Sequence, residues 1–270
     1  MPNLLIAIVI FLSYAGLSAY FWRAQHGGKT DPASRGLIGH AVLLPLALHG
    51  YLLHSDIFAN GSFDFGLLNA LSLIIWLTLC VYWVARFFYP LGELLTLVLP
   101  VAALAAVLPS LFPSEHLLVH THTFAFTAHI SAAMLAYSLF TIAVFHAVLI
   151  SQVEKRLHQH TLPRMLRNLP PLLTMERLLF QIIAIGFVLL TLTLASGVFF
   201  SEQIFGKAAQ FNHKVLFGLI SWLVFATLLW GHLRHGWRGR IAVRWTVSGF
   251  AFLLIAYLGS KFVLEILLQR

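Results

Sequence analysis

Eight apolar runs, each close to the length that crosses a lipid bilayer, constrain this chain more than any other feature of its sequence. A helix needs about 20 apolar residues to cross the hydrocarbon core. Of the 270 residues, 60% are apolar and 10% are charged, which is too few charges to cover a water-soluble domain. The sequence therefore predicts an all-α fold, a polytopic integral membrane helical bundle that forms a single transmembrane domain over residues 1–270. The expected spans lie near residues 3–22, 37–54, 66–84, 92–112, 124–151, 181–200, 214–231 and 244–267.

The lysines and arginines fall almost entirely into alternate loops, which predicts an orientation. Thirteen of the 17 basic residues follow the first, third, fifth and seventh spans. Short cytoplasmic loops collect Lys and Arg, so we expect these loops inside, both termini outside, and a location in the cell inner membrane. No Lys or Arg precedes the first span, so we expect it to remain as a helix and not to be cleaved as a secretory signal. This topology also explains the net charge of +8 without nucleic-acid binding.

Missing motifs exclude several kinds of chemistry. Cys80 is the single cysteine and lies inside an apolar run, so the chain has no disulfide framework, redox pair or CxxCH haem-attachment motif. It also lacks a Walker loop, a GxSxG motif and an HExxH motif. No carboxylate or thiolate is expected near the bilayer centre, which disfavours a site for zinc or a transported divalent ion. We expect no catalytic residues and no enzyme activity.

The segment EHLLVHTHTFAFTAH, residues 115–129, carries four histidines and runs from an outer loop into the fifth span. We expect its first three histidines in solvent. His129 lies about a turn and a half inside the span, where a polar side chain usually faces the bundle interior. Small and aromatic residues share its helical face and suit a flat apolar ligand: His122, Phe126, Ala133, Ala136, Tyr137 and Phe140. The alternative is a hydrogen bond from His129 to a neighbouring helix.

A second outer histidine, His213, opens the seventh span behind Asn212, which is an expected N-cap. By the loop lengths it lies at a membrane depth similar to that of His129. Two neutral imidazoles from facing helices are what an axially coordinated haem iron requires, so His129 and His213 are the predicted ligands of a haem b. Lys214, like Lys207 and Lys261, is a basic residue expected outside, where it suits a haem propionate. The alternative role of His213 is helix capping or contact with lipid headgroups.

Two further histidines are alternative partners for His129. One is His122, and the other is His49, in the outer half of the second span, which is also suited to hydrogen-bond a ligand residue. His40 and His146 lie toward the cytoplasmic ends of their spans. His146 is about 25 Å along the helix from His129, so the two cannot share one iron. A second site at the inner face is a further alternative.

Six segments are distinctive when taken together. They are FGLLNALSLIIW at 65–76, HISAAMLAYSLF at 129–140, PPLLTMERLLF at 170–180, LLTLTLASG at 189–197, NHKVLFGLISWLVFATLLWGHLRHGWRGR at 212–240 and GFAFLLIAYLGSKFVLE at 249–265. In combination they resemble the cytochrome c assembly family, a family of CcsA/CcmC-like membrane haem handlers. The resemblance is strongest to its short YpjD/HemX-like branch. The resemblance implies a helical bundle that binds haem at its outer face and takes part in cytochrome maturation.

The resemblance also extends to single residues. His129 matches the outer haem-ligating histidine of the family, and His213 stands where the family's tryptophan-rich segment ends. The WGxxWxWD signature of the larger members is absent and FGKAAQFNHK stands in its place. No histidine follows the eighth span to match their second outer ligand. The resemblance therefore does not extend to haem export or to ligation of haem to an apocytochrome.

Two of the matching segments are expected at the inner face. The segment GWRGR, residues 236–240, matches the family's motif between the last two spans, and a basic turn flanked by glycines at the interface is expected to anchor the topology. Glu176 of PPLLTMER is expected to pair with Arg177 or a loop cation, or to bind a partner.

The sequence thus predicts an assembly or haem-handling factor whose partners are the lipid bilayer, haem and cytochrome maturation proteins, with no nucleic acid. Two alternatives stay open. One is a non-haem membrane regulator or transporter subunit linked to divalent cation handling, in which the histidines are structural. The other is an electron-transfer haem b subunit, which would copurify with a redox enzyme.

Overall fold

The structure is a computed structural model that describes residues 2–27, 40–57, 63–64, 66–88, 94–112, 117–118, 124–159, 170–201 and 213–259. These residues form eight α-helices: α1 (Pro2–Gly27), α3 (Leu43–Ile57), α4 (Leu67–Ala85), α5 (Leu94–Leu111), α6 (Phe124–His158), α7 (Leu172–Phe199), α9 (His213–His235) and α10 (Gly239–Leu254). A short π-helix, Ile255–Gly259, continues α10. The expected all-helical, polytopic architecture is confirmed.

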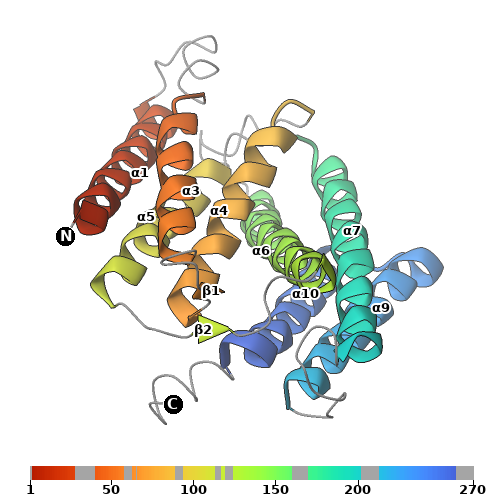
Figure 1. Cartoon of the computed structure of the whole chain (residues 1–270). Coiled ribbons are helices and arrows are strands. Elements are labelled where there is room, and N and C mark those ends of the chain that lie inside the picture. The colour runs from red at the N-terminus through yellow and green to blue at the C-terminus, as the bar shows by residue number, and fades with distance from the viewer. Residues whose placement is uncertain are drawn as a thin grey trace.

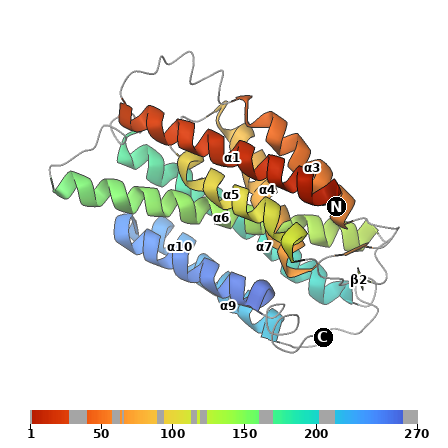
Figure 2. The same cartoon turned by 90° about the vertical axis from the view of Figure 1, so that its left-hand side faces the viewer.

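Two sets of four helices make up the molecule. In the first set, α1, α3, α4 and α5 contact one another in a ring, and in the second set α6, α7, α9 and α10 do the same. Figure 1 shows α1, α3, α4 and α5 on the left and α7 and α9 on the right. Helix α6 also contacts α4 and α5, so it joins the two sets, and Figure 2 shows it running between α5 and α10.

Seven of the described helices are long and apolar enough to cross a bilayer. The eighth, α3, has 15 residues and is shorter than the span expected from residue 37. Residues 41–42 form a turn, and α3 begins at Leu43. Pro45 has no backbone N–H and is well suited to the first turn of a helix, which fits a start at Leu43.

Helix α7 begins at Leu172, whereas the sequence predicted a span from residue 181. Pro171 precedes the helix, and its carbonyl oxygen accepts the N–H groups of Thr174 and Met175 at 2.8 and 3.2 Å. The prediction was too short because the search for apolar residues stopped at Glu176 and Arg177, although Leu, Met, Glu and Arg all favour a helix. Most of PPLLTMER is therefore helical, and similar polar extensions lengthen α6 at its end and α10 at its start.

Large aromatic and small residues alternate where the second set of helices packs around α6. The rings of Phe140 in α6 and Phe225 in α9 stack with their centroids 4.0 Å apart. Gly186 of α7 faces the Phe140 ring, and Gly249 of α10 faces the Phe225 ring. Glycines let helices approach closely in membranes, so these pairs fill the middle of the four-helix set.

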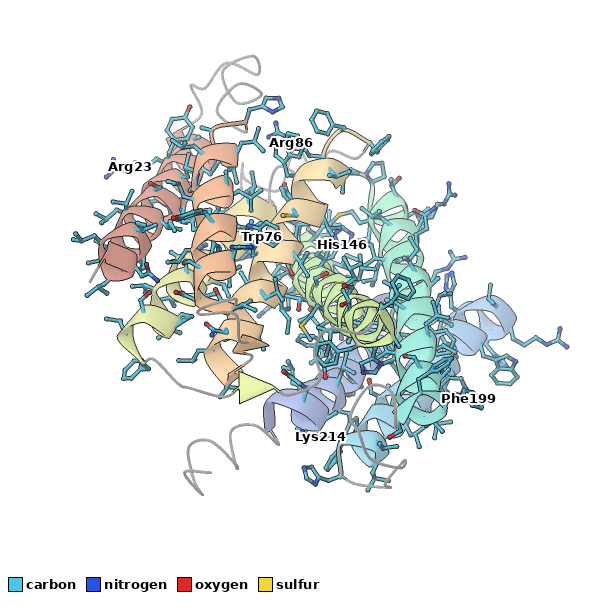
Figure 3. The ribbon with its side chains drawn as sticks, viewed as in Figure 1. Arg23, Trp76, Arg86, His146, Phe199 and Lys214 are labelled. Carbon is cyan, nitrogen blue, oxygen red and sulfur yellow. The ribbon has the colours of Figure 1, made fainter. Side chains whose placement is uncertain are left out.

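The two ends of the bundle differ in their side chains. Figure 3 shows Arg23 and Arg86 toward one end and Phe199 and Lys214 toward the other. At the second end, β1 (Phe63–Asp64) pairs antiparallel with β2 (Leu117–Leu118), which ties the segment before α4 to the segment before α6. These strands have two residues each and do not change the helical class of the fold. We call the end with Arg23 the inner end and the end with Lys214 the outer end.

Candidate functional site

His129 lies near the outer end of α6 and points toward α7. It is the sixth residue of the helix and is partly buried, and its Nδ1 atom lies 2.8 Å from the Oγ atom of Ser196 in α7. The sequence offered a ligand role or a hydrogen bond to a neighbouring helix as alternatives. The structure shows the hydrogen bond to the neighbouring helix.

The hydroxyl oxygen of Ser196 also lies 3.1 Å from the carbonyl oxygen of Thr193. A serine hydroxyl has one proton, so when Ser196 donates to Thr193 its oxygen accepts from Nδ1 of His129, and when it donates to Nδ1 the imidazole carries its proton on Nε2. In a neutral imidazole with its proton on Nδ1, the lone pair is on Nε2. Metal-ligating histidines are commonly held in this way, with the other ring nitrogen donating to a fixed acceptor. Ser196 therefore holds the His129 ring in place, and in the first of these two arrangements Nε2 is its basic nitrogen.

Gly197 leaves room for the imidazole ring. A Cβ atom at this position would lie 3.3 Å from Cε1 of His129, which is tighter than an ordinary contact. The serine and the glycine that follows it thus act together, because one fixes the ring and the other accommodates it.

The predicted inward face of α6 is largely used for packing. Phe126, Ala133, Ala136, Tyr137 and Phe140 are buried, as expected of an inward face. Tyr137 donates from its hydroxyl to the carbonyl oxygen of Leu253 at 2.8 Å, and Phe140 stacks on Phe225. The predicted slot for a flat ligand therefore does not continue inward past Tyr137.

His213 and Lys214 begin α9 at the same outer end, and both are exposed. A Cβ atom at Gly218 would lie 3.2 Å from Leu194, which fixes the register of the antiparallel helices α7 and α9. Counting outward from this contact at 1.5 Å per residue, His213 lies about 4.5 Å farther out than Ser196. His129 and His213 thus stand on diagonal helices of the second set at similar depths, as the sequence predicted.

The two alternative partners of His129 are placed differently. His49 is fully buried in the first set of helices, where its Nε2 atom lies 2.9 Å from Ser72 Oγ in α4 and its Nδ1 atom lies 3.5 Å from the Tyr14 hydroxyl in α1. The structure does not bring His49 to His129. His122 lies outside the described residues, as do Lys207 and Lys261.

His146 and His40, which were expected toward the cytoplasmic ends of their spans, each contact a neighbouring segment. His146 is buried, and its Nε2 atom donates to the carbonyl oxygen of Met175 in α7 at 2.9 Å. The ring of His40 lies against Trp83 and Phe87. Among the described residues, no group of three or more His, Cys, Asp or Glu side chains could hold a metal ion.

The inner end holds a contact that the sequence did not predict. Glu176 of α7 is buried, and its Oε1 atom accepts the backbone N–H of Gly239 at the start of α10, at 2.8 Å. Gly239 has a φ of +54°, a conformation that favours glycine. Glu154 of α6 approaches the same turn and pairs with Arg240 at 3.5 Å. Two carboxylates from two helices therefore fix the beginning of α10.

Aromatic residues fix the other side of this turn. The ring of His232 in α9 stacks on Phe180 of α7, with centroids 3.4 Å apart. Its Nδ1 atom lies 3.0 Å from the carbonyl oxygen of Trp237. The segments PPLLTMER and GWRGR, which lie far apart in the sequence, are thus in direct contact through Glu176 and Gly239.

Comparison with known proteins found a matching family model and related membrane proteins. The model of the cytochrome c assembly protein family matches residues 37–268. The inner membrane protein YpjD of Escherichia coli strain K12 is 30% identical over 229 residues, which cover 84% of this chain and 86% of that protein. The cytochrome c biogenesis protein CcsA of Prochlorococcus marinus strain MIT 9515 is 36% identical over 89 residues, or 33% of this chain and 28% of that protein. No solved structure matches the chain.

The helices of spanning length and the similarity to YpjD define a multi-pass protein of the inner membrane. Within that class, the chain belongs to the cytochrome c assembly protein family. The resemblance found in the sequence segments is confirmed, and the match extends to residue 37, ahead of the six segments that indicated it.

Proposed function

We propose that this protein binds haem b at the outer face of the inner membrane and acts as a haem-handling or assembly factor for cytochrome c, with no turnover chemistry of its own. His129 is the first axial ligand and His213 is the second. The observation that carries the proposal is the pairing of His129 with Ser196, which can hold the imidazole with its proton on Nδ1 and its basic nitrogen at Nε2, as metal-ligating histidines are commonly held.

The described residues fit this group. Haem supplies an iron that accepts two axial ligands, and neutral imidazoles serve in that role. Helical bundles place such ligands on facing helices, and His129 and His213 occupy diagonal helices at one end of a four-helix set. Lys214 is exposed next to His213 and supplies a cation for a propionate. Phe126 of α6 is buried close to His129 along the chain and adds apolar surface.

The orientation follows from the charges at the two ends. Arg23 and Arg86 lie at the inner end. Arg238 precedes α10 and Arg240 lies in its first turn, where Arg240 pairs with Glu154 near the end of α6. Cytoplasmic loops collect such residues, so the end with His129 and Lys214 faces outward and both termini lie outside. This orientation places the proposed ligands on the side where cytochrome maturation proteins would receive haem. The name of the relative CcsA, a cytochrome c biogenesis protein, supports that assignment of partners.

A haem titration of the purified apoprotein tests the proposal. We expect tight binding by the wild type, a large loss in His129→Ala, and a smaller loss in His213→Ala, because the His213 ring is exposed at a helix end. His54→Ala is the matched control, since His54 is an exposed histidine near the end of α3. Equal affinities in all four proteins would overturn the assignment of the ligands. A loss in His122→Ala with none in His213→Ala would instead assign His122 as the second ligand.

A further inference from the structure

Four exposed arginines gather where α9 ends and α10 begins. They are Arg234, Arg238, Arg240 and Arg244. Arg240 pairs with Glu154, at 3.5 Å. Within the described part of the chain, the other three arginines have no carboxylate partner. The cluster therefore carries a net positive charge at the inner end.

The backbone that carries these arginines is fixed in place. Glu176 accepts the N–H of Gly239, and the ring of His232 packs on Phe180 while it contacts the carbonyl oxygen of Trp237. Trp237 also donates its backbone N–H to the carbonyl oxygen of Gly231, at 3.2 Å. A loop that served only to carry positive charge would not need this set of contacts. These contacts make the backbone of the turn rigid. A rigid backbone lowers the entropy cost when its side chains bind a partner.

Arg244 lies within α10 and not in the turn that precedes it. It is five residues past Gly239, so it sits about 7.5 Å along α10, inside the segment of spanning length. Arg240, Arg244 and Ser248 follow one another at intervals of four residues, and all three are exposed. They form a polar stripe along the exposed side of α10, a helix of spanning length. An unpaired charge is costly on such a helix. An anionic group from outside the protein would neutralise the charge of Arg244.

Tryptophan side chains border the cluster. Trp237 and Trp245 lie with their ring centroids 5.4 Å apart, and the exposed Trp230 lies against His235. Tryptophan favours the level of the lipid headgroups, because its ring is apolar and its N–H is polar. The aromatic residues therefore place the arginines at headgroup depth.

We propose that the inner end of α9 and α10 binds the phosphate headgroup of an anionic phospholipid, with Arg238 and Arg244 as the main contacts and Arg234 beside them. Guanidinium groups bind phosphate through paired hydrogen bonds, and basic surfaces on the cytoplasmic side of membrane helices bind anionic headgroups. Figure 2 shows α9 and α10 at the edge of the bundle, on the opposite side of α6 from α1, where a lipid can approach. This inference does not depend on haem binding.

The test measures lipid binding to the full-length protein in neutral detergent by native mass spectrometry. The probes are phosphatidylglycerol and phosphatidylcholine with the same acyl chains. The variant Arg238→Gln with Arg244→Gln is compared with Arg23→Gln with Arg156→Gln, which removes two exposed cations at the inner ends of α1 and α6. We expect phosphatidylglycerol affinity to fall about 30-fold in the first variant and little in the second, from the usual contribution of an arginine near an anionic surface. Phosphatidylcholine binding should be weak and unchanged.

If the double variant does not fold, the single variant Arg244→Gln tests the proposed lipid site. We expect Arg244→Gln to weaken phosphatidylglycerol binding about fivefold. Equal losses in the two double variants would mean diffuse attraction and would overturn the proposal, as would no loss in Arg244→Gln. Displacement of the lipid by inorganic phosphate would identify a free anion as the ligand instead. A dimer in lipid-free detergent that Arg244→Gln disperses would identify a second copy of the chain as the occupant.

Discussion

Nδ1 of His129 and the hydroxyl oxygen of Ser196 lie 2.8 Å apart, although 67 positions separate the two residues in the chain. The contact joins α6 to α7 near the outer end of the bundle. The Ser196 hydroxyl also lies 3.1 Å from the carbonyl oxygen of Thr193, so it can donate there and accept from Nδ1 of His129, which leaves Nε2 as the basic nitrogen. The side chain that orients the proposed ligand therefore comes from the neighbouring helix α7 and not from α6.

Removing the Ser196 hydroxyl should weaken haem binding without unfolding the protein. In Ser196→Ala, Nδ1 of His129 loses its acceptor, and the ring can turn or exchange its proton between the two nitrogens. Supporting partners of metal ligands are typically worth 10–100-fold in affinity, so we expect at least about a tenfold loss, with a change in the absorption bands of the bound haem. The matched control is Thr227→Ala, because the hydroxyl of Thr227 bonds within its own helix, to Leu223, at 2.8 Å. Identical spectra and affinities for Ser196→Ala and wild type would show that Ser196 does not position the ligand.

A methyl group at Gly197 should disturb the same ring from the other side. The new Cβ atom would lie 3.3 Å from Cε1 of His129, so the imidazole has to shift by a few tenths of an ångström. We expect Gly197→Ala to alter the haem absorption bands and to lower haem affinity. Gly16→Ala in α1 is the control, because a Cβ atom there meets nothing within 4 Å. If both variants bind haem like the wild type, His129 does not sit in the binding site as described.

His49 should matter for stability and not for haem. In His49→Ala, the hydroxyl groups of Tyr14 and Ser72 lose a buried partner and a cavity opens between α1, α3 and α4. Leaving a buried polar group without its partner costs about 1–3 kcal/mol, so thermal unfolding in detergent should occur at a lower temperature. The positions of the haem bands should not change. Loss of the haem spectrum from folded His49→Ala would make His49 a ligand and would contradict its placement between Tyr14 and Ser72.

Glu176 should be needed to hold the start of α10. The variant Glu176→Ala leaves the N–H of Gly239 without its acceptor, which we expect to destabilise the protein by about 1–3 kcal/mol. Glu176→Gln keeps an acceptor oxygen and should cost less. Glu154→Ala should also cost less, because its ion pair with Arg240 lies near the surface, where such pairs contribute at most about 1 kcal/mol. Unfolding temperatures measured side by side would refute this account if Glu154→Ala proved the most harmful of the three.

The helices and the inward side of α6 could be predicted because both follow local rules. Apolar runs of spanning length give the helices, and a polar residue such as His129 within an apolar run is expected to face inward. The predicted start of the span that corresponds to α7 was wrong, because hydropathy alone excludes charged residues that lie at the end of a membrane helix. Glu176 was assigned to a loop for that reason, although the residues around it favour a helix.

The partners of these residues could not be predicted, because a contact between helices depends on their packing and register. The sequence LASG contains Ser196 and Gly197, and a serine next to a glycine in a membrane helix is a weak sign of close helix contact. Nothing in it indicates His129 as the neighbour. The same holds for Glu176 and Gly239, which are 63 positions apart. His49 seemed a suitable ligand from its depth alone, and only the packing of α1 and α4 around it shows its two partners.

The absorption spectrum of the purified protein, oxidised and then reduced with dithionite, tests the central claim most directly. We predict the spectrum of a low-spin haem b with two histidine ligands in the wild type, its loss in His129→Ala, and a changed spectrum in His213→Ala. His54→Ala should match the wild type. A wild-type protein that stays colourless after haem is supplied, or one whose spectrum is unaltered in His129→Ala, would contradict the account.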